Sequence, residues 1–209
     1  MSSLVPDLPT LADDEIHVWQ IPWTAGAGEQ LFVSLLANYA GPDVPPVARG
    51  EHGKPYFPAP FGGLGFNWSH SGDRALFAIG RGDEGFELGV DVERVRPRPR
   101  ALELARRFFA ADEAAMLASL PGDAQLNAFL RLWTAKEAVL KANGGGLSYG
   151  LHRVAFEIDD KAVKAVAFDG EIAPSSAWRI EPLDLGLDCV AAVAWRGRAR
   201  TIRVFTYAL

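Results

Sequence analysis

The sequence predicts an α+β fold, in which strands surround a group of helices without regular strand–helix alternation. Two observations support this prediction: short apolar runs typical of strands occur toward both ends of the chain, and longer helical patterns occupy its middle. With 209 residues and 49% hydrophobic content, the chain can bury a substantial core in one compact domain or in two small halves.

The first part of the chain is expected to contain four strands and one helix. The strands are predicted from apolar runs bounded by turn residues, at 16–21, 64–68, 75–79 and 86–95. The helix is predicted at 30–39, between the first two strands.

The second part opens with helical patterns and ends in strands. We expect helices near 100–109, 112–120 and 123–143, with Asp123 as a candidate N-cap. Gly144, Gly145 and Gly146 should end the third helix, because glycine readily adopts positive φ. Five strands are expected afterwards, at 154–158, 163–168, 177–180, 190–195 and 201–207.

The most informative segment is 133–141, W-T-A-K-E-A-V-L-K, which places Glu137 and Lys141 one helical turn apart beside Trp133. An acid and a base on one helix face could transfer protons next to a phosphate. The alternative is an ordinary surface ion pair, which would stabilise the helix by roughly 0.2–0.5 kcal/mol.

A second acidic element lies upstream, in Gly89-Val90-Asp91-Val92-Glu93. Alternation along a strand puts both carboxylates on one face and both valines on the other. Two like charges so close together in a half-buried strand favour a cation between them. With Glu137 they would offer three oxygen ligands, which suits Mg²⁺.

These two elements, read together with Gly53-Lys54-Pro55-Tyr56-Phe57 and the segment 66–72, F-N-W-S-H-S-G, resemble the 4′-phosphopantetheinyl transferase superfamily. The order G-K-P, F-N-x-S-H-S-G, G-x-D-x-E and W-x-x-K-E-A-x-x-K resembles its larger, surfactin-synthetase-activating (Sfp) type. The resemblance covers residues 49–147. It implies a pseudo-twofold arrangement of two similar α+β halves with coenzyme A at their interface. The proline-rich segment 95–100 would then separate an N-terminal half, 1–97, from a C-terminal half, 98–209, that carries the W-x-x-K-E-A-x-x-K helix.

The resemblance also implies an activity. The family transfers 4′-phosphopantetheine from coenzyme A to a serine of an acyl or peptidyl carrier protein and leaves adenosine 3′,5′-bisphosphate. By this resemblance, Asp91, Glu93 and Glu137 would hold Mg²⁺ against the pyrophosphate. Glu137 would also take the serine proton, directly or through water, and Lys141 would stabilise or protonate the departing phosphate.

Further residues are expected at the coenzyme by the same resemblance. Ser69 and His70 would hold its 3′-phosphate, with two hydroxyls and the imidazole around it. Lys54 would lie along the adenosine with Arg49 as a candidate partner. The remaining residues expected to contact coenzyme A are Pro55, Asn67, Asp91 and Lys141. Alternatively, an isolated histidine such as His70 is a structural residue, and G-K-P is a turn at an edge strand.

One departure from the family concerns the segment 23–50. Related proteins usually carry a longer segment rich in Arg and Lys there, whereas this one contains only Arg49. Either Arg49, Lys54 and His70 grip the 3′-phosphate alone, or the affinity for coenzyme A is reduced.

The net charge of −5 conceals a local run of six arginines. These are Arg94, Arg96, Arg98, Arg100, Arg106 and Arg107. The run is either a solvated face or a positive rim that meets an acidic carrier or the coenzyme phosphates. Nucleic-acid binding is disfavoured, because the chain is acidic and lacks a recognised module.

No apolar run approaches the roughly 20 residues that span a bilayer, and the N-terminus lacks the features of a signal peptide. We therefore expect a cytoplasmic protein that does not bind membranes, and two linked halves suggest a monomer. The pathway would be fatty-acid, polyketide or nonribosomal-peptide synthesis.

Two other functions remain open. The chain could bind coenzyme A or the carrier with reduced or no transferase turnover, for which the base-poor segment argues. It could also be a metal-dependent phosphohydrolase that uses the same carboxylates.

Overall fold

In a computed structural model of the chain, the structure describes residues 9–24, 26–41, 46–159 and 162–207, apart from the side chains of residues 27 and 29. Residues 1–8, on which the expectation about a signal peptide partly rests, lie outside this range. The strands are β1 (Glu15–Pro22), β2 (Ala48–Arg49), β3 (Pro55–Tyr56), β4 (Leu64–Ser71), β5 (Arg74–Arg81), β6 (Leu88–Arg94), β7 (Val154–Ile158), β8 (Val163–Phe168), β9 (Trp178–Leu183), β10 (Cys189–Arg196) and β11 (Thr201–Thr206). The helices are α1 (Ala27–Ala40), α2 (Ala101–Phe108), α3 (Ala111–Ser119), α4 (Gly122–Asn143) and α5 (Gly146–Tyr149), with short 3₁₀ helices at Leu151–Arg153, Gly170–Ile172 and Ser175–Ala177.

The architecture confirms the α+β class: every helix and strand predicted above is present, with bounds shifted by a few residues. One prediction needs correction in detail. Asp123 is not the N-cap of α4, because the helix begins at Gly122 after Pro121 and has no side-chain cap. The G-K-P segment connects β2 to β3, which pair with each other as a two-stranded hairpin.

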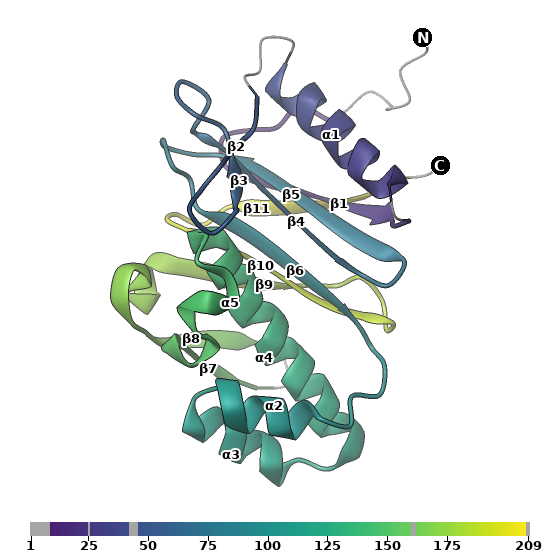
Figure 1. The fold of residues 1–209 in the computed structure, drawn as a ribbon, viewed down its shortest axis with the longest axis vertical. Helices are drawn as coiled ribbons and strands as arrows, with labels where there is room; N and C mark the ends of the chain where they lie inside the picture. The colour runs from purple at the N-terminus through teal and green to yellow at the C-terminus, as the bar shows by residue number, and fades with distance from the viewer. Residues whose placement is uncertain (1–8, 25, 42–45, 160–161, 208–209) are drawn as a thin grey trace.

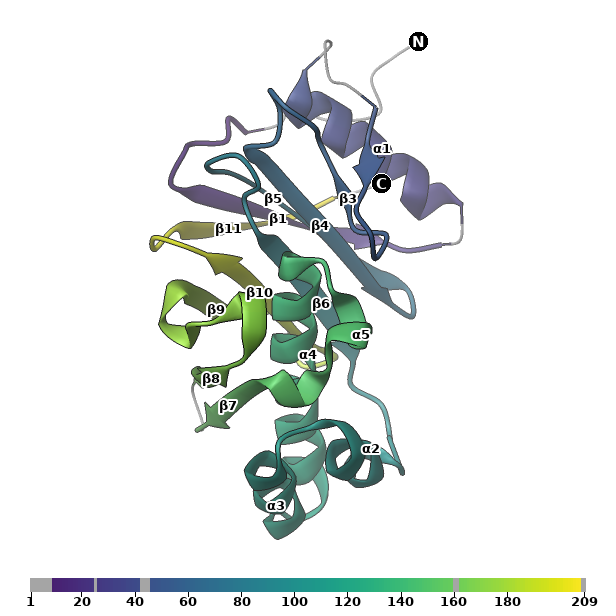
Figure 2. The same cartoon turned by 60° about the vertical axis from the view of Figure 1, so that its left-hand side comes forward.

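Two sheets form the centre of the molecule, as Figures 1 and 2 show from two sides. The first sheet has the strand order β11-β1-β5-β4, and the second has the order β6-β10-β9. β11 runs parallel to β1, whereas the other neighbours in both sheets are antiparallel. Helix α1 covers the outer face of the first sheet, α4 lies against the second, and α2 and α3 lie at the far end from α1 (Figure 2).

Hydrophobic clusters fill the spaces between these layers. Between the two sheets, side chains such as Val18 and Leu76 from one sheet pack against Val90 and Val193 from the other. A second cluster lies under α1, and the largest one surrounds α4. Val90 and Val92 therefore face the inter-sheet core, as the alternation in 89–93 predicts, and Asp91 and Glu93 face the other way.

The division into halves at residue 97 stays a prediction. Strands from before residue 97 pair with strands from after it: β6 pairs with β10, and β1 pairs with β11. Among the described residues, no helix is both long enough and apolar enough to cross a membrane.

Candidate functional site

Helix α4 lies directly against β6 at Gly89. A Cβ atom built on Gly89 would stand 2.0 Å from the carbonyl oxygen of Ala138 and 2.5 Å from the amide nitrogen of Ala142. Such distances are far inside van der Waals contact, so only glycine permits this approach of helix to strand. The contact brings the helix face that carries Glu137 and Lys141 over the carboxylates of β6.

Strand β4 supplies the other side of the site through its own alternation. The side chain of Asn67 accepts a hydrogen bond from the Val90 amide (3.0 Å), Ser69 donates to Asp91 Oδ1 (2.7 Å), and Ser71 donates to Glu93 Oε2 (2.9 Å). Alternate side chains of β4 therefore bond successive positions along β6, and these bonds connect the first sheet to the second. We call these three pairs the β4–β6 ladder.

Lys141 joins the helix to this ladder. Its Nζ donates to Asp91 Oδ1 (2.7 Å) and to Ser69 Oγ (2.8 Å). No ion pair links Lys141 to Glu137 among the described residues, so the interpretation of these two as a surface ion pair is wrong. Segments from β4, β6 and α4, far apart in the sequence, meet at one point as the motifs predicted.

Glu137 is buried close to the same carboxylates. Burial, together with repulsion by Asp91 and Glu93, raises the pKa of Glu137 to about 7, although Lys141 acts in the opposite direction. Burial also raises the pKa of Asp91, against the effects of Lys141 and Ser69. A carboxyl group with a pKa near neutrality can both accept and release a proton.

The residues that the sequence assigns to a divalent cation fit one in part. Asp91 Oδ2 is buried and has no hydrogen-bond partner within the described part of the chain, and Glu137 is the neighbouring oxygen donor. Such hard oxygen donors suit Mg²⁺, which often takes one or two carboxylates and keeps water or phosphate for the rest. The third candidate, Glu93, is engaged by the guanidinium of Arg98. Accordingly, no group of three acidic, His or Cys side chains among the described residues is already arranged around a metal position.

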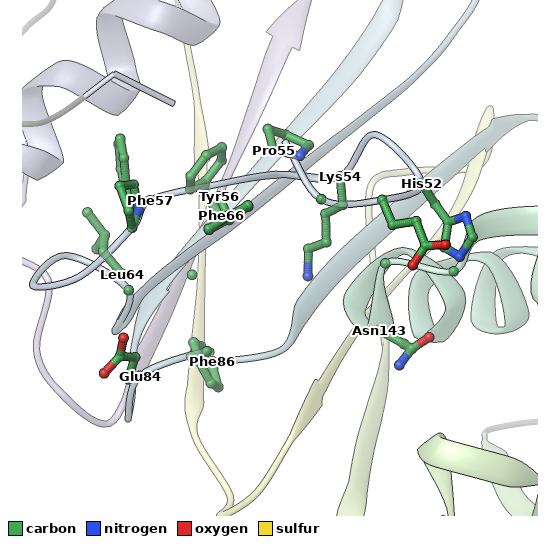
Figure 3. Close-up of a pocket in the computed structure, with 18 of the residues that line it drawn as sticks. His52, Lys54, Pro55, Tyr56, Phe57, Leu64, Phe66, Glu84, Phe86 and Asn143 are labelled. Carbon is green, nitrogen blue, oxygen red and sulfur yellow. The ribbon is translucent and has the colours of Figure 1, made fainter. Parts of the chain in front are cut away.

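A cleft extends from this centre along the β2–β3 hairpin. Its inner part, about 210 Å³, is lined by Lys141, Asn67 and Trp68, and by Lys54 and Pro55 from the hairpin. The outer part, about 590 Å³, is bordered at one end by Asn143 and Lys54 and at the other by aromatic side chains. Figure 3 shows Phe57, Phe66 and Phe86 around this outer part, with Lys54 extending into the space between the hairpin and α4.

Lys54 does more than line the cleft. Its Nζ donates to the carbonyl oxygen of Ala142 in the last turn of α4, and its stem lies near Gly144, whose φ of +94° ends the helix as predicted. Burial lowers the pKa of Lys54 to about 8, although attraction to Glu87 opposes this. The lysine of G-K-P thus fixes the end of the helix that carries Glu137 and Lys141.

His70 lies on the opposite face of β4 from Ser69, so the hydroxyls of Ser69 and Ser71 do not surround one point with its imidazole. Its exposed ring stacks on Trp23 at 4.5 Å between centroids, and Trp23 also stacks on Trp68 at 5.2 Å. β4 is the edge strand of its sheet, and the inner cleft is lined by Asn67 and Trp68 of this strand and not by His70. Arg49 is exposed, and its guanidinium donates to the Gly53 carbonyl (3.1 Å) within the hairpin.

A buried ion pair anchors α4 to α3. Lys136 Nζ lies 2.7 Å from Glu113 Oε2 and also donates to the carbonyl oxygens of Leu151 (3.0 Å) and Val154. Glu113 in turn accepts from the amides of Ala110 and Phe156. Both side chains are almost fully buried, so the lysine of W-x-x-K-E holds α4 in place.

Several of these roles were not predicted from the sequence. The alternation of Asn67, Ser69 and Ser71 matches that of Asp91 and Glu93, and this common period was the available signal for the β4–β6 ladder. Nothing local in the sequence indicates that Trp23 covers His70, that Arg98 reaches Glu93, or that Lys136 finds Glu113.

Comparisons with known proteins place the chain in one family. Residues 87–194, which include β6 and all of α4, match the model of the 4'-phosphopantetheinyl transferase superfamily. The 4'-phosphopantetheinyl transferase HetI of Nostoc sp. (strain PCC 7120) is 30% identical over 90% of this chain and 90% of its own. The protein slr0495 of Synechocystis sp. (strain PCC 6803) is 42% identical over 59% of this chain, a region that spans 48% of its own length. A 4'-phosphopantetheinyl transferase of Bacillus subtilis is 33% identical over 64% of this chain and 57% of its own.

The family model covers more than half of the chain, and HetI aligns over nine-tenths of both proteins. The family that the four motifs indicated is thereby confirmed, and the region matched by the family model contains Asp91, Glu93, Glu137 and Lys141. The chain belongs to the 4′-phosphopantetheinyl transferase superfamily.

Proposed function

We propose that the protein transfers 4′-phosphopantetheine from coenzyme A to a serine hydroxyl of an acyl or peptidyl carrier protein. The observation that carries this proposal is the convergence of Asp91 and Glu137 with Lys141, whose side chain lines the inner part of the cleft. The names of the relatives support the same reaction.

In the proposed step, the serine oxygen forms a bond to the β-phosphorus of coenzyme A. The bond between that phosphorus and the oxygen bridging to the α-phosphate breaks, and adenosine 3′,5′-bisphosphate leaves. Glu137 takes the serine proton, directly or through water, and its pKa of about 7 suits a base that works near neutral pH. Lys141 stands where its ammonium group can stabilise the negative charge that develops on the departing phosphate.

Asp91 and Glu137, together with Glu93 once it is free, would hold Mg²⁺. The ion would supply positive charge that neutralises the pyrophosphate. Ser69 keeps Asp91 and Lys141 in register through its two hydrogen bonds. Asn67 positions the strand that carries Asp91, through its bond to the Val90 amide.

The coenzyme would occupy the cleft along Lys54 and Pro55. His70, exposed at the edge of β4, and Arg49 would reach the 3′-phosphate from the rim. Trp23, which stacks on His70, belongs to the segment 23–50 in which related proteins usually carry a basic run.

The remaining assignments follow from the reaction. We infer an acidic carrier domain as the macromolecular partner and the cytoplasm as the compartment, since coenzyme A and carrier domains meet there. We also infer a monomer, with neither nucleic acid nor membrane as a partner. The pathway would be fatty-acid, polyketide or nonribosomal-peptide synthesis.

The test is to incubate the protein with coenzyme A, Mg²⁺ and a panel of apo carrier proteins, and to measure the intact mass of each carrier. We expect one carrier serine to gain the mass of a phosphopantetheine group. No gain on any carrier would overturn the proposal.

The same samples separate the two alternatives. Binding of coenzyme A in calorimetry without a carrier adduct would identify a binding protein. Release of phosphopantetheine from coenzyme A in the absence of carrier would identify a phosphohydrolase.

A further inference from the structure

Arg98 lies beside the proposed metal centre but belongs to none of the four motifs. Its guanidinium contacts Glu93 Oε2, and the two side chains are only 21% and 16% exposed. Arg98 Nε is buried and has no hydrogen-bond partner within the described residues. Glu93 is therefore the main group that holds this guanidinium in place.

The backbone around Arg98 restricts where its side chain can go. Pro97 and Pro99 flank it, and a proline fixes its own φ and disfavours helical geometry at the residue before it. The Arg98 carbonyl also accepts a hydrogen bond from the Ala101 amide (2.9 Å) at the start of α2. The loop between β6 and α2 thus presents the guanidinium to the strand that precedes it.

The contact between Arg98 and Glu93 affects the net charge of the centre. Asp91, Glu93 and Glu137 contribute three carboxylates, against the two cations Lys141 and Arg98. With all three carboxylates ionised, the centre carries one excess negative charge. A bound divalent cation would change the net charge of the centre to one excess positive charge. If Arg98 left the centre when the cation bound, the net charge would be zero.

We propose that Arg98 is an internal counter-cation, which holds Glu93 in the cation-free protein and leaves it when a divalent cation binds. The inference rests on the proposed function only in taking Asp91, Glu93 and Glu137 as the cation site. It makes Arg98 a competitor for one ligand, so that Arg98 sets the cation concentration at which the site fills.

The experiment is a titration with Mn²⁺, followed by the electron paramagnetic resonance signal of the free ion, on the full chain with and without coenzyme A. For Arg98→Gln we expect Mn²⁺ to bind about three- to tenfold more tightly than to the unchanged protein, because one partly buried charge pair no longer competes. Arg100→Gln is the matched control. It removes the same charge two residues away, where Arg100 pairs with Glu103 at the surface, and we expect little change.

A second pair of variants separates the contact from the general loss of positive charge. Glu93→Gln should weaken Mn²⁺ binding. The double variant Glu93→Gln/Arg98→Gln should bind Mn²⁺ as weakly as Glu93→Gln alone, because the competing contact is already absent. Thermal unfolding of each variant confirms that it is folded.

The outcomes are distinguishable. Unchanged or weaker Mn²⁺ binding by Arg98→Gln would overturn the role of Arg98 but leave the transferase proposal intact. Tightening of equal size in the Glu93→Gln background would attribute the effect to net charge and would also overturn it. Absence of Mn²⁺ binding by every protein, with or without coenzyme A, would refute the cation site itself, while the carrier mass measurement reports on transfer independently.

Discussion

Gly89 of β6 faces the carbonyl oxygen of Ala138 on α4, and an added Cβ would stand 2.0 Å from it. The atoms that crowd this position belong to the helix backbone, so they cannot move aside as a side chain would. The separation between α4 and β6, and with it the placement of Glu137 above Asp91, depends on this one glycine.

Gly89→Ala should therefore destabilise the protein and shift α4. We expect a loss of about 2–3 kcal/mol or more in the free energy of unfolding by urea, since overpacking typically costs 1–3 kcal/mol and backbone cannot repack. Gly50→Ala is the control, because its nearest contact would be an ordinary 3.7 Å. Equal free energies of unfolding for the two variants would show that α4 can move away from β6 without destabilising the protein.

Glu137→Gln should abolish most of the proposed transfer without unfolding the protein. A general base typically contributes about 10² to 10⁴ in rate, so we expect the turnover number to fall by at least about a hundredfold. The measurement is the rate of holo-carrier formation, with the exposed Glu157→Gln as control. A Glu137→Gln variant with full turnover would remove Glu137 from the reaction.

Stability without divalent cations should fall as pH rises from about 4.5 to about 7. The pKa of Glu137 is raised from 4.5 in the unfolded chain to about 7 in the folded one, so the native state binds the proton more tightly across this range. Its stabilising contribution is complete below pH 4.5 and is lost once the pH passes 7. Urea unfolding in EDTA should show this decline, and Glu137→Gln should flatten it. An identical pH dependence in both proteins would contradict the assignment.

Lys136→Met should be strongly destabilising although it touches no reacting atom. The change leaves the buried Glu113 carboxylate without its cation, which costs about 3–5 kcal/mol in comparable pairs. Lys164→Met removes one partner of the exposed pair with Asp159 and should cost less than about 1 kcal/mol. The measurement is urea unfolding of both variants. An equal loss in the free energy of unfolding would show that the buried pair stabilises the protein no more than the exposed pair does.

Carrier binding should depend on Arg106 and Arg107 of α2, which take part in no ion pair within the described residues. Arg94, Arg98 and Arg100 are already engaged by carboxylates, which narrows the expected positive rim to its other members. Charge reversal of Arg106 and Arg107 together, both exposed, should raise the apparent KM for an acidic carrier by about tenfold at low salt, with little change in kcat. Loss of the effect at high salt would support electrostatic steering. An unchanged KM at low salt would exclude α2 as the docking surface.

Much of this molecule could be predicted from local sequence. Period-2 and period-3.6 patterns identified the strands and helices, and the Asp91–Glu93 alternation correctly separated carboxylates from core valines. The short hairpin β2–β3 was open to interpretation, because two-residue strands carry too little pattern to be recognised.

What could not be predicted depends on contacts between distant segments. Lys136 looks like any solvated helix residue until Glu113 and the carbonyls of Leu151 and Val154 surround it. The sequence likewise grouped Ser69 with His70, whereas strand geometry puts them on opposite faces. The stacking of Trp23 on His70 depends on the pairing of β1 with β5 and of β5 with β4, which puts the residue after β1 beside the β4–β5 turn.

The β4–β6 ladder has an evolutionary consequence. Ser69 and Ser71 each donate to one acid of β6, so these positions form coupled pairs rather than separate motifs. Substitutions within a pair should show epistasis, and across homologous chains the identity at 69 should covary with that at 91, and 71 with 93. A mutation in either strand would then be tolerated mainly in backgrounds where its partner has already changed.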